Sequence, residues 1–407
     1  MEMVNNRAKI LYIFFLWKPL LKFFLKGEET VEGLISFWIP FLKLLNSPEV
    51  DKIVALIFVN KKLCPTKRFV IPTKYSNKLL IYPIYFNGNF KSISFVLLKL
   101  PYAIYKGIYL ILKYKINKIY GHGTIGALAG VLSLFTGVPN IRRLYGMSRA
   151  KSDFHLPKWQ FFLKHPTTYL SLSLKAEAII MTNDGSWGDK FFSKFGNRKS
   201  KFLFLFNGVE KNLESHIKKP KNIELPQQYI SYIARIDRFK RQHLAIKAFS
   251  FLKSSQQNDF PHLVILGPIS DEGYYRELIT LCKTLDLENK VHFISALPWE
   301  EALFVLKKSK ITLILYELST LSNVFLESLV LQVPIIAINA NNSFSSIPKD
   351  IYFEVKETPQ LIADRIMKLL NDESLAKEMT EKGKKFVDQY FLSWEERARI
   401  ELEILLN

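Results

Sequence analysis

Short apolar runs alternate with helical patterns along the whole chain, and this alternation is typical of parallel sheets whose strands are joined by crossover helices. In the first half, helices are expected at residues 31–46 and 93–114, among others. Strands are expected near residues 10–16, 52–58, 79–83, 116–120, 140–144, 178–182 and 202–206. In the second half, strands are expected near residues 229–234, 261–266, 290–294, 311–315 and 334–338. The pattern predicts an α/β protein built from two Rossmann-like units.

A polar segment separates the two predicted units. Residues 211–228 (KNLESHIKKPKNIELPQQ) include two prolines and lack apolar periodicity, so they are predicted to form a linker. The expected domains are then residues 1–210 and 229–385, with a further helix within residues 386–407. A chain of 407 residues is long enough for each domain to bury its own core. Ligands of open parallel sheets bind beyond the carboxyl ends of the strands, so two such domains facing each other would form a site in the cleft between them.

The net charge of +20 is concentrated in the first half of the chain. Residues 1–210 contain 31 basic and 11 acidic residues, whereas residues 211–407 contain 26 of each. In the first half the basic residues are interleaved with aromatic and leucine residues, which favours docking on an anionic membrane surface. Nucleic acid would also attract such a chain, but the sequence contains no recognisable reader motif. We therefore predict a peripheral membrane partner and no nucleic acid, with a plain excess of lysine as the simpler alternative.

Three other features limit the class of protein. The uncharged run from Ile119 to Ile141 is long enough to span a membrane, but its glycines and Pro139 favour a strand end, a turn, a small-residue helix and a further strand. Cys64 and Cys282 fall in different predicted domains and show no ligand spacing with histidine. No clear Asp-x-Asp pair is present either. We predict a cytoplasmic protein with no structural disulfide, no metal site and no cofactor.

The first candidate site is the junction between a strand and a helix at residues 229–249, YISYIARIDRFKRQHLAIKAF. Arg235 and Lys240 lie at this junction. Backbone N–H groups at a helix N-terminus already favour negative charge, and two added cations suit a diphosphate better than a carboxylate. A solvated basic turn is the alternative interpretation.

The same residues resemble the donor-phosphate segment of the GT-B glycosyltransferases of family 4. In that family an apolar strand is followed by Gly-Arg-Leu, a short polar loop, Lys-Gly and a helix. Arg235 and Lys240 match this pattern, whereas Ala234 and Arg241 stand where the family has its two glycines. The resemblance implies that Arg235 and Lys240 hold the diphosphate of a nucleotide sugar.

A second segment of the same resemblance spans residues 311–337, ITLILYELSTLSNVFLESLVLQVPIIA. A strand ends in a polar loop and a helix begins near Ser322, where free backbone N–H groups could hold phosphate. Glu327 matches the second of two glutamates in the family motif, and the resemblance implies that it binds the nucleotide ribose. Asn323 and Val324 also match the motif and are predicted with Ser322 to line the donor site.

The first glutamate of that motif does not match. Its position holds Ser319, and the nearest carboxylate is Glu317, two residues earlier. An altered loop would let Glu317 act on the donor sugar, so we predict Glu317 as a catalytic residue, with a merely solvated glutamate as the alternative.

Two further residues complete the predicted site. Gly267 resembles the family's glycine after a strand, which lets the backbone approach the nucleotide, although a tight turn explains it equally well.

His122 follows a strand directly, with glycines on both sides, and is predicted to act catalytically by donating to the acceptor or the sugar. The family often has histidine before glycine after the strand that matches residues 140–144, where this chain has Tyr145 before Gly146. Whether His122, Tyr145 or neither shapes the acceptor side is left open by the sequence.

The resemblance extends from Lys201 to Leu406, and more loosely back to Asp51. It implies a retaining, metal-independent glycosyltransferase of GT-B fold, with an acceptor-side N-terminal domain, a nucleotide-sugar-binding C-terminal domain and a last helix that crosses back to the first. The implied partners are a nucleotide-diphosphate sugar and a lipid-linked or saccharide acceptor, in cell-surface polysaccharide or glycolipid synthesis. The missing glutamate leaves two alternatives, which are a catalytically silent GT-B subunit that stabilises a partner enzyme and a sugar-nucleotide epimerase.

Overall fold

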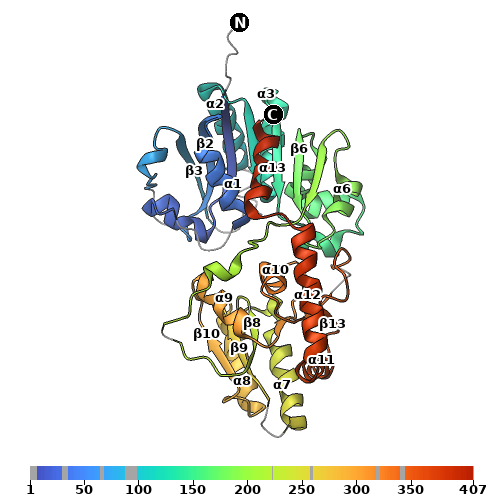
Figure 1. Cartoon of the computed structure of the whole chain (residues 1–407). Helices are drawn as coiled ribbons and strands as arrows, with labels where there is room; N and C mark the ends of the chain where they lie inside the picture. The colour runs from blue at the N-terminus through green and yellow to red at the C-terminus, as the bar shows by residue number, and fades with distance from the viewer. Residues whose placement is uncertain are drawn as a thin grey trace. The chain divides into compact units, whose positions relative to one another are not determined.

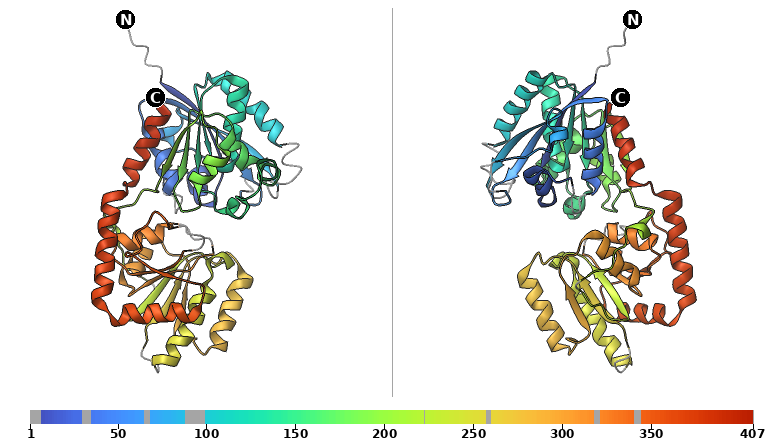
Figure 2. Two further views of the ribbon diagram at one scale, coloured as in Figure 1. Left: turned by 90° about the vertical axis from the view of Figure 1, so that its right-hand side faces the viewer. Right: turned by 60° about the vertical axis from the view of Figure 1, so that its left-hand side comes forward.

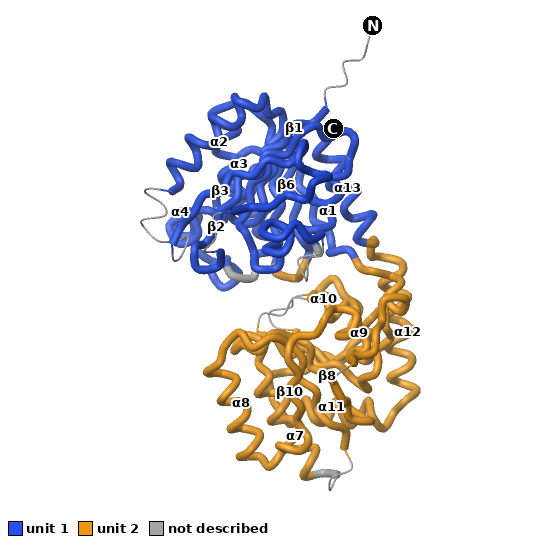
Figure 3. Tube along the Cα trace, turned by 90° about the vertical axis from the view of Figure 1, so that its left-hand side faces the viewer, with its two compact units in different colours: residues 1–183, 187–208, 394–407 blue, residues 184–186, 209–393 orange. Residues whose placement is uncertain are grey.

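The computed structural model describes residues 7–29, 35–64, 68–87, 99–221, 223–256, 260–317, 321–339 and 344–406. Its contacts divide the chain into two compact units (Figures 1 and 3). Unit 1 comprises residues 1–183, 187–208 and 394–407, and unit 2 comprises residues 184–186 and 209–393. The last helix of the chain therefore belongs to the same unit as the first strand.

Unit 1 is built on a seven-stranded sheet in the order β3-β2-β1-β4-β5-β6-β7. Every neighbouring pair of strands runs parallel. All seven strands expected from the sequence are present. Their bounds are Ala8–Phe15 (β1), Val50–Asn60 (β2), Leu79–Phe86 (β3), Lys118–His122 (β4), Asn140–Leu144 (β5), Ala178–Thr182 (β6) and Lys201–Leu205 (β7).

The first sheet is covered on both faces, which explains why its strands are almost continuously apolar. Alternate residues of β1 point to opposite faces. Ile10, Tyr12 and Phe14 pack with the helices α1 (Ile35–Asn46) and α13 (Trp394–Leu406), and α13 lies along unit 1 in both views of Figure 2. The intervening β1 residues pack with α2 (Leu100–Tyr114) and α3 (Ala127–Thr136) on the other face.

The two helices expected in the first half correspond to α1 and α2. Residues 31–34 and 93–98 of the expected ranges lie outside the described residues. Three shorter helices cover the β5–β7 side of the sheet with a separate aromatic cluster. They are α4 (Lys158–Lys164), α5 (Pro166–Ser173) and α6 (Gly188–Phe195).

Unit 2 contains a six-stranded parallel sheet in the order β10-β9-β8-β11-β12-β13. The bounds are Tyr229–Ile233 (β8), His262–Leu266 (β9), Val291–Ile294 (β10), Thr312–Ile314 (β11), Ile335–Ile338 (β12) and Phe353–Val355 (β13). The sequence pattern predicts the first five of these strands but not β13. This strand has three residues with a glutamate at its centre, and it lies at the sheet edge beside β12, so it has almost no apolar periodicity to detect.

The first four helices of unit 2 join successive strands as crossover connections, and the last two follow β13. Their bounds are Gln242–Gln256 (α7), Glu272–Thr284 (α8), Trp299–Lys308 (α9), Asn323–Val330 (α10), Pro359–Asn371 (α11) and Glu373–Tyr390 (α12). In each sheet the order of the strands reverses beside the first strand, between β1 and β4 and between β8 and β11. The carboxyl ends of the strands at such a reversal are where ligands of this architecture bind.

Candidate functional site

The turn after β8 holds the two predicted phosphate-binding cations. Asp237 caps a short 3-10 turn, Arg238–Lys240, by accepting a hydrogen bond from the Lys240 backbone N–H at 3.1 Å. Arg235 precedes this cap, and its Nη2 lies 3.3 Å from a carboxylate oxygen of Asp237. The Arg235 side chain is 62% exposed. Its guanidinium therefore remains accessible to an anion.

Lys240 lies in a different environment on the same turn. Its ammonium is 3.5 Å from the centre of the Tyr316 ring, a cation–π contact. Burial, followed by the charge of Arg235, lowers the pKa of Lys240 to about 8. The turn thus pairs an exposed guanidinium with a largely covered ammonium that loses its proton more easily than an ordinary lysine.

Glu317, the predicted catalytic residue, lies beside this turn. It follows β11, and its backbone N–H donates a hydrogen bond to the carbonyl oxygen of Phe239 at 2.9 Å. Its carboxylate is 47% exposed and has an oxygen 4.0 Å from Nε of Arg241. The structure therefore brings Glu317 together with the Arg235 and Lys240 turn, at the strand reversal of the second sheet. Ser319 lies outside the described residues.

The predicted donor-site helix is α10. Ser322 caps its N-terminus, and its hydroxyl oxygen accepts a hydrogen bond from the Phe325 backbone N–H at 3.2 Å. Asn323 is exposed and Val324 is half-buried. Because Ser322 uses only one of the free N–H groups of the first turn, others remain for a ligand.

Glu327 lies one turn further along α10. The Trp299 indole Nε1 donates a hydrogen bond to its carboxylate at 2.9 Å. Burial raises the pKa of Glu327, and the bond from Trp299 opposes this shift. Trp299 was not identified from the sequence, because a tryptophan at the start of an amphipathic helix gives no pattern beyond that of a packing residue.

Gly267 packs against the backbone of the cation turn. Its φ is +154°, and a Cβ atom at this position would lie 2.1 Å from the carbonyl oxygen of Ala234, the residue before Arg235. Glycine is therefore required here by contact within the protein. This contact favours the tight-turn interpretation of Gly267, and its predicted approach to a nucleotide stays a prediction.

Unit 1 has a pocket of about 350 Å³ at the carboxyl ends of β1, β4 and β5. Its walls combine two aromatic residues with small, apolar and hydroxyl side chains. The lining residues are Trp17, Gly123, Thr124, Leu144, Tyr145, Gly146, Met147, Ala150, Thr168 and Ser171. Tyr145 was considered for this side of the molecule from the sequence, whereas Trp17 was not.

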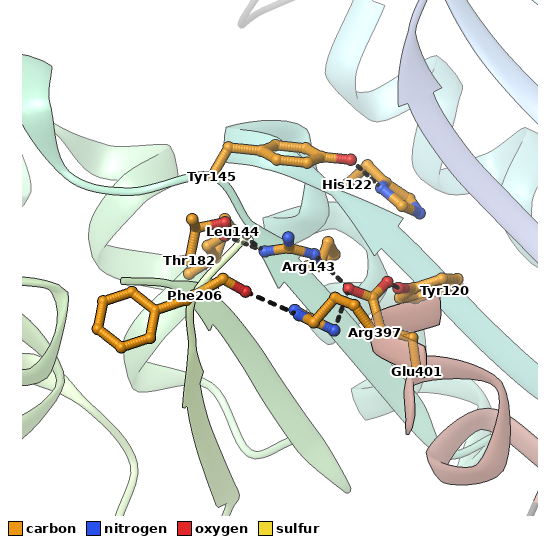
Figure 4. Close-up of polar contacts among 9 residues, drawn as sticks. All are labelled: Tyr120, His122, Arg143, Leu144, Tyr145, Thr182, Phe206, Arg397 and Glu401. Carbon is orange, nitrogen blue, oxygen red and sulfur yellow. Dashed lines mark hydrogen bonds and ion pairs between the residues drawn. The ribbon is translucent and has the colours of Figure 1, made fainter. Parts of the chain in front are cut away.

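His122 does not line this pocket. It is fully buried, and its Nδ1 lies 2.7 Å from the Tyr145 hydroxyl (Figure 4). Its ring stacks on Tyr12 with 4.7 Å between ring centres. Burial, followed by the charge of Arg143, holds the pKa of His122 well below its ordinary value, so the imidazole is neutral near pH 7. The contact with the Tyr145 hydroxyl links His122 to a residue of the pocket wall.

A buried ion network lies beneath Tyr145. The carboxylate of Glu401 is 2.8 Å from Nε of Arg143 and 2.7 Å from Nη1 of Arg397. It also accepts a hydrogen bond from the Tyr120 hydroxyl at 2.8 Å (Figure 4). The guanidinium of Arg143 lies 4.9 Å from the centre of the Tyr145 ring. Residues of β4 and β5 are thus tied to α13 within unit 1.

Residues 214–386, which lie within unit 2, match the family described as Glycosyl transferases group 1. This match covers less than half of the chain. It includes the Arg235, Lys240 and Glu327 segments, and the predicted resemblance is confirmed at the level of glycosyl transferases group 1. No curated protein matches the chain in sequence. Among the described residues, no three histidine, cysteine or acidic side chains are grouped to hold a metal ion.

Solved structures confirm the predicted fold. A crystal structure of Anabaena Alr3699/HepE in complex with UDP and glucose is 15% identical over 98% of this chain and 100% of that chain, with a TM-score of 0.67. A sucrose-phosphate synthase from Thermosynechococcus elongatus is 15% identical over 98% of both chains, also with a TM-score of 0.67. A UDP-N-acetylglucosamine 2-epimerase is 12% identical over 98% of this chain and 95% of that chain, with a TM-score of 0.58. The group 1 domain therefore occurs in a chain with the GT-B architecture of these proteins.

Proposed function

We propose that this protein transfers a sugar from a nucleotide-diphosphate donor to a saccharide acceptor, with retention of configuration and without a metal ion. The observation that carries the proposal is the turn at residues 235–241 beside Glu317, at the strand reversal of a glycosyl transferases group 1 domain. Two cations at this position can neutralise the charge that develops on a diphosphate leaving group. The solved relative from Anabaena binds UDP and glucose, which supports a nucleotide sugar as the donor.

In this proposal each residue has a separate task. The exposed guanidinium of Arg235 and the ammonium of Lys240 bind the diphosphate, and the free N–H groups near Asn323 add donors at the start of α10. Glu327, oriented by Trp299, accepts hydrogen bonds from the ribose. Glu317 acts on the donor sugar. No step in this scheme needs a metal ion, because the two cations supply the positive charge.

The acceptor is proposed to enter the pocket of unit 1. Trp17 and Tyr145 present aromatic surface there, and Thr124, Thr168 and Ser171 present hydroxyl groups. Flat aromatic faces with a few hydroxyls suit the apolar face of a sugar ring together with its polar edge. We propose a lipid-linked saccharide as the acceptor, used in the assembly of a surface polysaccharide or glycolipid.

A lipid-linked acceptor requires the protein to reach a membrane, and α2 offers a suitable surface. Tyr102, Tyr105, Tyr109 and Leu112 lie at helical spacing on α2 and are 41 to 71% exposed. Lys106 and Lys113 contact the ring of Tyr109, and residues 101–150 include no acidic residue. Interfacial tyrosines with lysines beside them suit an anionic bilayer surface, and we propose attachment to the cytoplasmic face. Among the described residues, no helix is long and apolar enough to cross a bilayer.

The function is tested by a nucleotide screen followed by a transfer assay. Thermal shift with UDP, GDP, ADP and dTDP should identify one stabilising diphosphate. The matching nucleotide sugar should then release that diphosphate when a polyprenyl-diphosphate-linked saccharide is added. A silent subunit would release no diphosphate, and an epimerase would convert the donor sugar without an acceptor. Either result would overturn the proposed transfer.

The affinity for diphosphate is predicted to fall as the pH rises from about 7 to about 9. The protonated Lys240 ammonium attracts phosphate, and its pKa of about 8 means that this attraction is lost as the pH passes through that value. Isothermal titration with UDP should therefore show wild-type affinity converging with that of Lys240→Gln at high pH. Titration of the UDP phosphates affects both proteins equally. If the two proteins lose affinity for UDP in parallel as the pH rises, Lys240 is not the group responsible.

Membrane attachment is predicted to depend on the lysines around α2. Full-length protein should sediment with phosphatidylglycerol vesicles but not with phosphatidylcholine vesicles, and less so at high salt. Replacing four lysines with glutamine should reduce sedimentation: Lys99, Lys106, Lys113 and Lys115. Lys118 follows α2 as well but is left unchanged, because its side chain is only 15% exposed and pairs with Glu177. Four exposed lysines of unit 2 provide the matched control: Lys247, Lys283, Lys310 and Lys356. Equal loss in both variants would indicate nonspecific charge attraction.

A further inference from the structure

Arg241 is an unusual residue at the end of the cation turn. Its φ of +52° lies in the left-handed region, where any residue other than glycine is strained. The family pattern that the turn resembles has a glycine at this position. Arg241 therefore occupies a backbone site that glycine fills more easily, which calls for a reason in the side chain.

The side chain of Arg241 lies between two carboxylates. Its Nη1 is 2.5 Å from Glu357, and its Nε is 4.0 Å from Glu317. It is only 17% exposed, compared with 62% for Arg235 on the same turn. Two carboxylates more than neutralise its charge, so Arg241 is poorly suited to bind a phosphate group itself. Arg235, which contacts a single aspartate, is the more accessible of these two arginines.

The same turn also holds Glu317 by its backbone. The Glu317 N–H donates to the carbonyl oxygen of Phe239, and the preceding residue, Tyr316, lies beneath the Lys240 ammonium. Glu317 is thus tethered to residues 239, 240 and 241 by a hydrogen bond, a neighbouring cation–π contact and an ion pair. An exposed glutamate at the end of a strand would otherwise sample several rotamers.

We propose that Arg241 is a positioning residue that holds the Glu317 carboxylate toward the donor sugar, with Glu357 fixing the guanidinium from the other side. The inference rests on the proposed function and extends it. The chain departs from the family pattern twice at this point, with an arginine for a glycine and a glutamate shifted by two residues, and the structure places these two departures in contact. The arginine compensates for the shift by supplying the charge that anchors the displaced carboxylate.

The test compares the affinities of a nucleotide sugar and of its diphosphate, with UDP-glucose and UDP as the first probes and the GDP, ADP and dTDP pairs as further probes. Arg241→Gln is expected to weaken binding of the sugar nucleotide by up to about fivefold while the diphosphate changes by less than about twofold. Glu317→Gln should do the same, and the double variant should be no weaker than either alone, because both act through one contact. Arg241→Lys should restore most of the loss.

A glycine variant separates the side chain from the backbone. Arg241→Gly should relieve the left-handed backbone yet lose the sugar-specific affinity, whereas Gln332→Gly relieves a similar φ of +55° elsewhere in unit 2 and should leave both affinities unchanged. Equal weakening of sugar nucleotide and diphosphate would make Arg241 a phosphate ligand and overturn the positioning role. Unchanged affinities in Arg241→Gln would overturn it as well. A wild-type protein that binds none of the diphosphates would instead refute the proposed function, and the positioning role with it.

Discussion

Replacing Arg235 or Lys240 with alanine is expected to weaken the binding of nucleoside diphosphates by roughly 10- to 150-fold each, with nucleoside binding almost unchanged. A charge-assisted hydrogen bond to phosphate contributes about 1.5–3 kcal/mol, and a nucleoside has no phosphate to lose. The two cations should contribute differently at high pH, because only Lys240 has a pKa of about 8. Isothermal titration with UDP and uridine, GDP and guanosine, and ADP and adenosine measures the difference.

Arg238 offers a matched control on the same turn. Its side chain is 59% exposed, and its guanidinium already pairs with Glu277 and lies 3.9 Å from Asp271. Arg238→Ala removes a cation of equal charge from the same 3-10 segment, but one whose charge is satisfied within the protein. Its effect on diphosphate binding should be small. If Arg238→Ala weakens binding as much as Arg235→Ala, general electrostatic attraction explains the effect better than a phosphate site.

The sequence predicts the layered fold well because both sheets are covered on both faces. Strands such as β1 and β9 are almost continuous apolar runs between turns, and this signal can be read without any knowledge of tertiary contacts. β13 lacks the signal because it has only three residues, one of them a glutamate, and lies at an edge. The two cations that the sequence predicts at one strand end, Arg235 and Lys240, lie on one turn after β8 in the structure, and their phosphate-binding role stays a prediction.

What the sequence could not supply is the set of partners that decides what each residue does. In the sequence, His122 follows a strand and is flanked by glycines, which is the pattern of an exposed catalytic histidine. In the structure its ring packs against the aromatic rings of Tyr12, Tyr120 and Phe37. Trp299 becomes relevant only because α9 brings it to Glu327. The contact of Arg241 with Glu357 spans 116 positions along the chain, and no local pattern predicts a pair at that separation.

Glu401→Ala is expected to destabilise unit 1 by about 3–5 kcal/mol. The carboxylate contacts Arg143 and Arg397, and the side chains of all three residues are at most 3% exposed. Removing it leaves two guanidinium groups buried without a counter-charge, and the hydroxyl of Tyr120 loses its acceptor (Figure 4). Urea unfolding measures the lost free energy of unfolding. Hydrogen exchange of peptides from β4, β5 and α13 assigns that loss to unit 1, because peptides of unit 2 report the stability of unit 2 separately.

The matched control is Glu395→Ala, which removes an ion pair from the first turn of the same helix. Glu395 is 73% exposed and lies 2.7 Å from Lys43 of α1, so its loss should cost no more than about 1 kcal/mol. Tyr120→Phe isolates the hydrogen bond to Glu401 and should cost about 1–2 kcal/mol without removing any charge. A Glu401→Ala protein as stable as Glu395→Ala would mean that the two arginines find other partners or water. Protection of α13 that persists in Glu401→Ala would further show that apolar contacts, such as those of Leu405 in the core beside β1, hold the helix on unit 1 without the ion network.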